Sequence, residues 1–160
     1  MGANELSIHL WRERELLELL LFKLEVQRLL LEDGKTRWIQ QAAGEVEQVL
    51  GHIRAQGLSR AVEVSSVAKE WGAPDEATLL DLIEAAPTTG WRDVLTEHRG
   101  VLTAIMAEVS QSRTANEMHL RAVARAVEDT LAELGAGTGE YNTRGTRTRD
   151  DSARIVDTEL

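Results

Sequence analysis

Residues 10–31 read LWRERELLELLLFKLEVQRLLL, and this leucine-rich stretch decides the fold. Leu10, Leu17, Leu24 and Leu31 recur at a strict seven-residue spacing. Six further leucines stand beside them: Leu6, Leu16, Leu20, Leu21, Leu29 and Leu30. The spacing predicts one apolar stripe along a helix over residues 4–32, wider than a two-stranded coiled coil needs. Other helices must cover this stripe, because such a helix is not stable alone in water.

The next segment continues the helical pattern. Apolar residues at three- and four-residue steps predict a second helix over 36–56. Gly44 and Gly51 weaken it by roughly 1 kcal/mol each relative to alanine, so we expect close helix packing at these positions. Gly57 either ends the helix or bends it, and a helical pattern resumes over 58–71.

The second half contains a short helix and a long one. A loop at 72–75 precedes a short helix over 76–86, and residues 87–90 end it. The last helix is predicted over 91–134, with a polar interval at 110–116 in its middle. After Leu134 the chain turns rich in Gly, Thr, Arg and Asp, with too little apolar surface to fold alone.

Together these segments predict an all-α fold. We expect an elongated antiparallel three-helix bundle or coiled coil with a short extra helix and a disordered C-terminal tail. The predicted division is a helical bundle domain over 4–134 and a flexible tail over 135–160.

Composition excludes several classes of partner. The chain has 27 acidic and 18 basic residues and a net charge of −9, which disfavours binding to nucleic acids and anionic membranes. It has no cysteine, so disulfides and thiolate chemistry are excluded. Its apolar runs are too short to span a bilayer, and its start lacks the features of a secretory signal. We therefore expect a cytoplasmic protein without membrane insertion.

No pattern in the sequence points to catalysis. The four histidines, His9, His52, His98 and His119, lack the three- or four-residue spacing of helical metal ligands. The carboxylates interleave with arginines on helix faces, and the serines lack a nearby base. The glycines of 135–139 follow a helix and lack the Gly-Lys-Ser/Thr ending of a phosphate loop. We expect no enzyme activity, metal or cofactor.

The four tryptophans each lie near a predicted helix end: Trp11, Trp38, Trp71 and Trp91. The favoured interpretation is that they fill gaps at the ends of the bundle. The alternative is that one of them is an exposed anchor for a partner.

Several short motifs occur in an order similar to that of a known family. They are residues 29–34, LLLEDG, at the end of the first helix; residues 78–83, TLLDLI; residues 116–120, NEMHL; and Tyr141 followed by Gly145. Over residues 6–145 the layout resembles the FlgN family of flagellar export chaperones, specifically its actinobacterial or Gram-positive form.

The resemblance implies a function and its residues. FlgN-type proteins bind the C-terminal helices of the hook–filament junction proteins FlgK and FlgL in the cytoplasm and deliver them to the flagellar export gate. Carried over to this chain, the cargo-binding residues are Asn116, Leu120, Val123, Val127, Leu131 and Leu134. Tyr141 resembles the family tyrosine that docks to the export gate.

Two alternatives remain open at this stage. Leu120 to Leu134 could instead close the core of the bundle, in which case cargo binding there becomes doubtful. The chain could also be a structural coiled-coil protein that acts through stable self-association, and a symmetric dimer through the first helix would favour that interpretation. For the chaperone we expect a monomer or a weak dimer.

Overall fold

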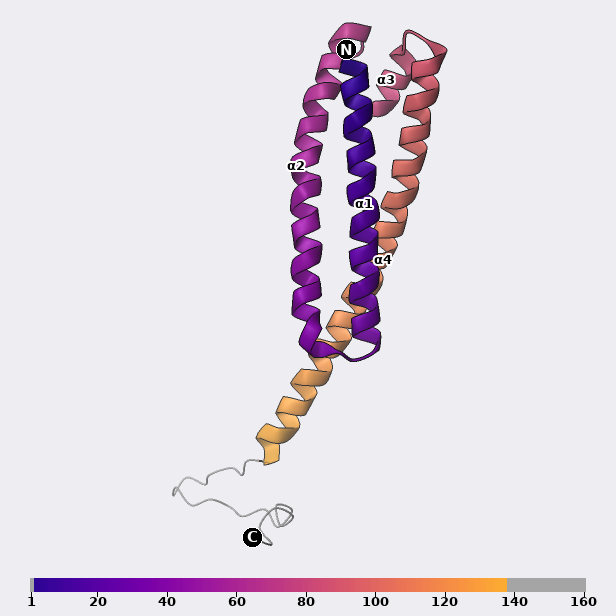
Figure 1. Cartoon of the computed structure of the whole chain (residues 1–160). Helices are drawn as coiled ribbons and strands as arrows, with labels where there is room; N and C mark the ends of the chain where they lie inside the picture. Colours follow the sequence, from indigo (N-terminus) through magenta and orange to yellow (C-terminus); the bar gives the residue numbers. More distant parts are fainter. Residues whose placement is uncertain (1, 138–160) are drawn as a thin grey trace. The chain divides into compact units, whose positions relative to one another are not determined.

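The computed structural model describes residues 2–137, which contain helices and no strand. The elements are α1 (Gly2–Glu32), the 3-10 turn η1 (Thr36–Trp38), α2 (Ile39–Trp71), α3 (Leu79–Ala85) and α4 (Thr89–Gly137) (Figure 1). The predicted all-α bundle is confirmed over this range. The chain divides into two compact units, Met1–Glu117 and Met118–Leu160. The division at residue 134 stays a prediction.

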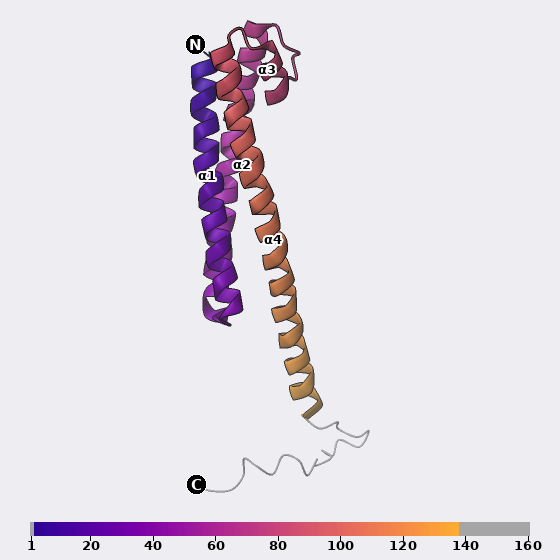
Figure 2. The same ribbon diagram turned by 90° about the vertical axis from the view of Figure 1, so that its right-hand side faces the viewer.

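Polar contacts in the first unit show how its long helices run. Ion pairs join Lys23 to Glu45 at 2.7 Å and Glu13 to Arg60 at 3.1 Å, so α1 and α2 are antiparallel. Ser7 contacts His98 and the Leu24 carbonyl contacts Asn116, so α1 and α4 run in the same direction (Figures 1 and 2).

The core forms where the leucine series predicts it. All four leucines of the seven-residue series are buried, as are Leu6 and Leu20. With the exception of Leu31, they form one core cluster with Val46, Val49 and Val67 of α2, with Leu82 of α3, and with Leu95, Leu102, Ile105 and Val109 of α4. Because α1 supplies apolar side chains to both long neighbours, it is the central packing element of the unit.

Two polar side chains interrupt this buried stripe of α1. Glu13 lies seven residues after Leu6, and Gln27 lies seven after Leu20. Burial raises the pKa of the Glu13 carboxyl, and the Arg60 guanidinium opposes that shift. Gln27 is 5% exposed and pairs with Asn116 of α4. Polar pairs therefore fill two core positions where leucine is expected.

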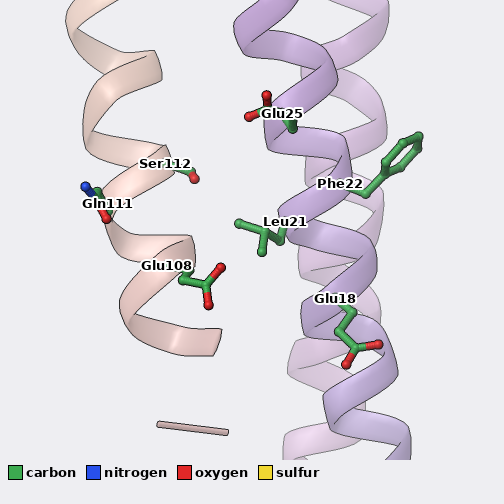
Figure 3. A pocket seen from close by; sticks show the side chains of 7 residues that line it. All are labelled: Glu18, Leu21, Phe22, Glu25, Glu108, Gln111 and Ser112. Carbon is green, nitrogen blue, oxygen red and sulfur yellow. The ribbon is translucent and has the colours of Figure 1, made fainter. Parts of the chain in front are cut away.

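The width of the leucine stripe has a structural explanation. The side of α1 opposite the core is also apolar, with exposed side chains from Ile8, Trp11, Leu19, Phe22 and Leu29. The helix is thus apolar on two sides, and the first unit covers only one of them. A groove of about 510 Å³ lies beside this outer side, between α1 and α4 (Figure 3).

Glycine ends the first two long helices. Gly34 and Gly72 have φ values of +66° and +71°, in the left-handed region that favours glycine. The following amides then reach back to the open carbonyls, Lys35 N to Leu30 O at 3.0 Å and Ala73 N to Ala68 O at 2.9 Å.

The short helix begins later than predicted, at Leu79. Thr78 is its N-cap, since its hydroxyl accepts from the Asp81 amide at 3.3 Å and the Asp81 carboxylate accepts from the Thr78 amide at 2.7 Å. The Thr78 hydroxyl, which donates to the Asp81 carboxylate at 2.6 Å, and then the Thr78 amide lower the pKa of Asp81. The capping box places residues 76 and 77 outside the helix.

The glycines inside α2 behave differently from the expectation. The helix continues through Gly57, which therefore does not end it. The prediction of close packing at Gly44 and Gly51 is wrong, because a methyl group at either position would meet no group within 4 Å. Packing of the apolar face, and not close approach at the glycines, stabilises this helix.

The tryptophans divide between the two interpretations. Trp71 and Trp91 pack against the core with their rings 6.3 Å apart, where they fill the bundle end as favoured. Trp11 and Trp38 are 50% and 48% exposed. Arg14 and Arg37 lie over these two rings, at 5.0 and 4.6 Å from the centroids.

Replacing the open glycines of α2 tests this description. Gly44→Ala, Gly51→Ala and Gly57→Ala should each raise the free energy of unfolding by about 0.5–1 kcal/mol, because alanine loses less backbone entropy on folding. Urea denaturation measures the change. Gly72→Ala is the matched control, and it should lower stability because its φ is +71°. Destabilisation by the α2 substitutions would contradict the open surroundings described here.

Candidate functional site

The buried side of α4 follows a regular helical spacing in the first unit. Its members recur at steps of three, four or seven residues and face α1: Leu95, His98, Leu102, Ile105, Val109 and Asn116. This spacing places them on one face of the helix. α4 therefore packs in the first unit by a single stripe.

The same spacing of apolar residues continues along α4 into the second unit. Leu120 lies four residues after Asn116, and Val123, Val127, Leu131 and Leu134 follow at steps of three or four. We name these five residues the α4 apolar face. α4 is the one helix that the structure describes in this unit, so no other described element of the unit covers the face.

Exposure rises along the α4 apolar face. Leu120 and Val123 are half-buried, whereas Val127, Leu131 and Leu134 are 53%, 62% and 65% exposed. The remaining sides of the helix are largely polar and carry Arg121, Arg125, Glu128, Asp129 and Glu133. The segment is an amphipathic helix with an accessible apolar side.

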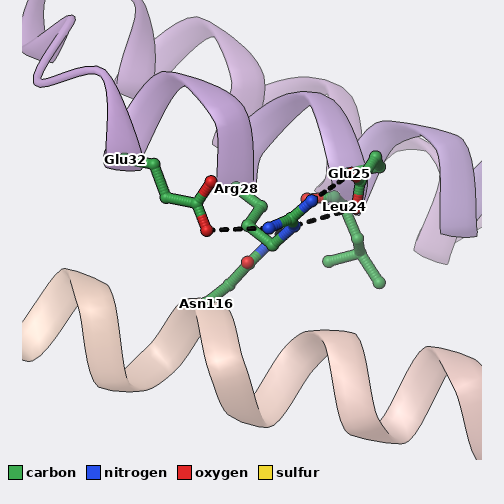
Figure 4. Close-up of polar contacts among 5 residues, drawn as sticks. All are labelled: Leu24, Glu25, Arg28, Glu32 and Asn116. Atoms are coloured by element: carbon green, nitrogen blue, oxygen red, sulfur yellow. Dashed lines mark hydrogen bonds and ion pairs between the residues drawn. The ribbon is translucent and has the colours of Figure 1, made fainter.

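The surroundings of Asn116 differ from those of these five residues. Asn116 is 2% exposed, and it lies close to Leu24 and Arg28 of α1 in Figure 4. Its amide nitrogen donates to the Leu24 carbonyl at 2.9 Å and to Gln27 Oε1 at 3.0 Å. Arg28 lies beside it and pairs with Glu25 and Glu32 on α1. These hydrogen bonds lower the pKa of Glu25 and raise that of Arg28. Asn116 thus joins α4 to α1 where the stripe leaves the core of the first unit.

The sequence alone did not identify Gln27 as the partner of Asn116. The available signal was its place in the leucine pattern, since a polar residue at a predicted core position needs a buried hydrogen-bond partner. Tyr141, the residue predicted to dock to the export gate, lies outside the described residues.

The described residues include one serine–histidine contact. Ser7 Oγ and His98 Nε2 are 3.0 Å apart, and the edge of the Trp11 ring meets the imidazole at 5.4 Å between centroids. No carboxylate of the described residues hydrogen-bonds to His98, so the orienting member of a catalytic triad is missing from this pair. The contact packs α1 against α4.

Burial also affects the pKa of His98. It lowers the pKa of the imidazole; Glu97 opposes the shift and Arg14 adds to it. No three metal-ligating side chains gather within residues 2–137, and none of the helices there is long and apolar enough to cross a bilayer. The distinctive surface of the second unit is therefore the α4 apolar face.

Acid should weaken the first unit through His98. Its folded pKa lies below that of the unfolded chain, so the unfolded state binds more protons and stability falls as the pH drops below about 6.5. Urea denaturation at neutral and mildly acidic pH measures this loss. Between neutral and mildly acidic pH, the His98→Gln variant should lose less stability than the original chain. An equal loss in both proteins would contradict the assignment of this pH dependence to His98. Glu13, whose raised pKa acts in the opposite sense, is present in both proteins.

The Asn116 contact predicts a large effect from a small change. Asn116→Asp replaces the donor with a carboxylate that faces two acceptors, so it should lower the free energy of unfolding by about 3 kcal/mol. Thermal and urea unfolding measure it. Asn4→Asp makes the same chemical change at an exposed position in the first turn of α1 and should be neutral or slightly stabilising. Equal stability of the two variants would contradict the described contact.

Comparison with known proteins identifies a family for this chain. The family model described as "FlgN protein" matches residues 1–149, which is most of the chain. No curated protein and no solved structure gives a significant match. The chain therefore belongs to the FlgN family, a family of flagellar export chaperones.

Proposed function

We propose that this chain is a cytoplasmic chaperone of flagellar type III export. It binds the C-terminal helical regions of the hook–filament junction proteins FlgK and FlgL, blocks their premature assembly and delivers them to the export gate. Family membership supports the general role. The observation that carries the binding site is the α4 apolar face, which continues a core-forming stripe and is largely exposed.

The contact is helix against helix. A partner helix with its own apolar stripe can lie along the α4 apolar face, anchored at the three- and four-residue steps that the face provides. Covering side chains as exposed as Val127, Leu131 and Leu134 contributes about 1–2 kcal/mol each. The cargo gains in the same way, because its own apolar stripe leaves water and cannot pair with another subunit.

Asn116 has a supporting role in this proposal. Its amide is occupied by α1, so it contributes by fixing α4 next to the face and not by direct contact with cargo. Tyr141 is proposed to dock to the export gate, on the strength of the family resemblance. Release at the gate requires only micromolar to nanomolar cargo affinity, about −8 to −12 kcal/mol.

One observation favours a second candidate, a structural protein that acts through stable self-association. The outer side of α1 exposes Ile8, Trp11, Leu19, Phe22 and Leu29. A symmetric dimer through this side would cover them. The two candidates differ in the α4 apolar face, which the chaperone needs to be accessible and which a dimer through α1 leaves unused.

Titration calorimetry with peptides of the C-terminal helices of FlgK and FlgL from the same genome tests the proposal. We expect a 1:1 complex of micromolar or tighter affinity. Leu131→Asp should weaken it by at least about tenfold, or 1.4 kcal/mol, because it places a charge in the apolar contact.

Two matched variants separate the roles. Leu58→Asp makes the same change at an α2 residue that is 74% exposed and should leave affinity unchanged. Tyr141→Ala should also leave cargo affinity unchanged, which would separate cargo binding from gate docking. If the protein is folded and self-associated but does not bind the FlgK and FlgL peptides, the cargo assignment is contradicted and the structural candidate is favoured.

A further inference from the structure

Two hollows lie along the same seam of the first unit, where α1 meets α4. The smaller, of about 150 Å³, is lined by Trp11 and Arg14 of α1 and by Val94, Glu97 and Val101 of α4. The larger, of about 510 Å³, is lined by Glu18, Leu21, Phe22 and Glu25 of α1 and by Glu108 and Ser112 of α4. We name the two together the α1–α4 groove.

The residues that line the two hollows follow one spacing along each helix, and we call this row of residues the track of the groove. On α1, Trp11, Glu18, Phe22 and Glu25 are separated by seven, four and three residues, which keeps them on one side of the helix. On α4, Val94, Val101 and Glu108 are separated by seven residues each. Residues 11–25 span about 21 Å along a helix, or about four turns.

The walls of the groove are partly apolar and exposed. Trp11, Phe22 and Val94 are 50%, 59% and 38% exposed. In Figure 3, Leu21 points toward α4 and Glu108 and Ser112 point toward α1, whereas the ring of Phe22, which also lines the larger hollow, points away from α4. On the α4 side the larger hollow is lined by the small residue Ser112.

The charge around this apolar track is strongly negative. Four carboxylates line it, from Glu18, Glu25, Glu97 and Glu108, against the single guanidinium of Arg14. Arg14 pairs with Glu18 at 2.9 Å, and Glu25 pairs with Arg28. Glu97 and Glu108 form no ion pair within the described residues, so the α4 wall carries uncompensated negative charge.

We propose that the α1–α4 groove binds a cationic amphipathic helix of a partner protein. About four turns would fit, with apolar side chains at three- and four-residue steps in the two hollows. Lysines or arginines on the flanks of that helix would face Glu97 and Glu108 on one side and the glutamates of α1 on the other. This surface is separate from the α4 apolar face, so the inference stands or falls independently of the proposed function.

Charge complementarity is the reason for choosing this occupant. A second copy of the chain also carries a net charge of −9 and would bring like charge to the groove. Nucleic acids and anionic lipids are repelled for the same reason. A cationic helix is the occupant that both the apolar track and the carboxylates favour.

A designed peptide tests the proposal with the full-length chain. The probe is a synthetic helix of about 14 residues with leucines at helical spacing and lysines on both flanks; its matched control carries glutamates in place of the lysines. Fluorescence anisotropy of the labelled peptide should show saturable binding of the lysine form that weakens as salt rises, and no binding of the glutamate form. Equal binding of both forms would overturn the proposal.

Variants of the chain then locate the site. Phe22→Ser should weaken binding by at least about tenfold, whereas Leu58→Ser, at an exposed leucine of α2 outside the groove, should not. Glu108→Lys should weaken it more than Glu63→Lys on α2, although both change the net charge equally. Equal losses in groove and control variants would mean general attraction to an acidic protein and would overturn the proposal.

Two further readouts separate other outcomes. Leu131→Asp should leave peptide binding unchanged, so failure of the groove and failure of the cargo site can be told apart. Sedimentation should show that Phe22→Ser leaves the oligomeric state as it is. If the chain instead forms a dimer that Phe22→Ser dissociates, and the lysine peptide does not bind, the groove is an interface between copies and the proposal is wrong.

Discussion

Burial of one leucine stripe is the constraint on which the rest of the first unit depends. Leu10, Leu17 and Leu24 of the seven-residue series of α1 share one core with residues of α2 and of α4, so both long helices are held by contacts with the same element. The short α3 adds Leu82 to this core. Because aromatic residues are only 4% of the chain, aliphatic packing against α1 supplies most of the stabilisation.

Much of this architecture follows from hydrophobic spacing in the sequence. The all-α class, the long helices and their glycine-terminated ends could be predicted because period and end signals are local properties. The glycines of α2 could not be interpreted in the same way, since their surroundings depend on tertiary contacts. The start of α3 depended on a side-chain hydrogen bond between Thr78 and Asp81, which the apolar pattern does not contain.

The same limits apply to the candidate site. The sequence showed that residues 120–134 are amphipathic but left open whether they close the core. The structure shows one stripe along α4 that is buried up to Asn116 and becomes exposed from Val127 onward. In the sequence, the outer side of α1 appeared only as extra width of the apolar stripe, beyond what a two-stranded coiled coil needs. Sequence spacing does not say which of two apolar sides of a helix contacts a neighbouring helix.

The contact between Asn116 and Gln27 also restricts the register of the two parallel helices. If α4 slid along α1 by seven residues, Asn116 would lie beside Leu17 and Leu20 in one direction or near Leu31 in the other. In the first position its amide would be buried among leucines without the Gln27 partner, at a cost of about 1–3 kcal/mol, and in the second it would also lose that partner. A uniform leucine seam tolerates such slippage, so this one polar pair specifies a single alignment of α1 and α4.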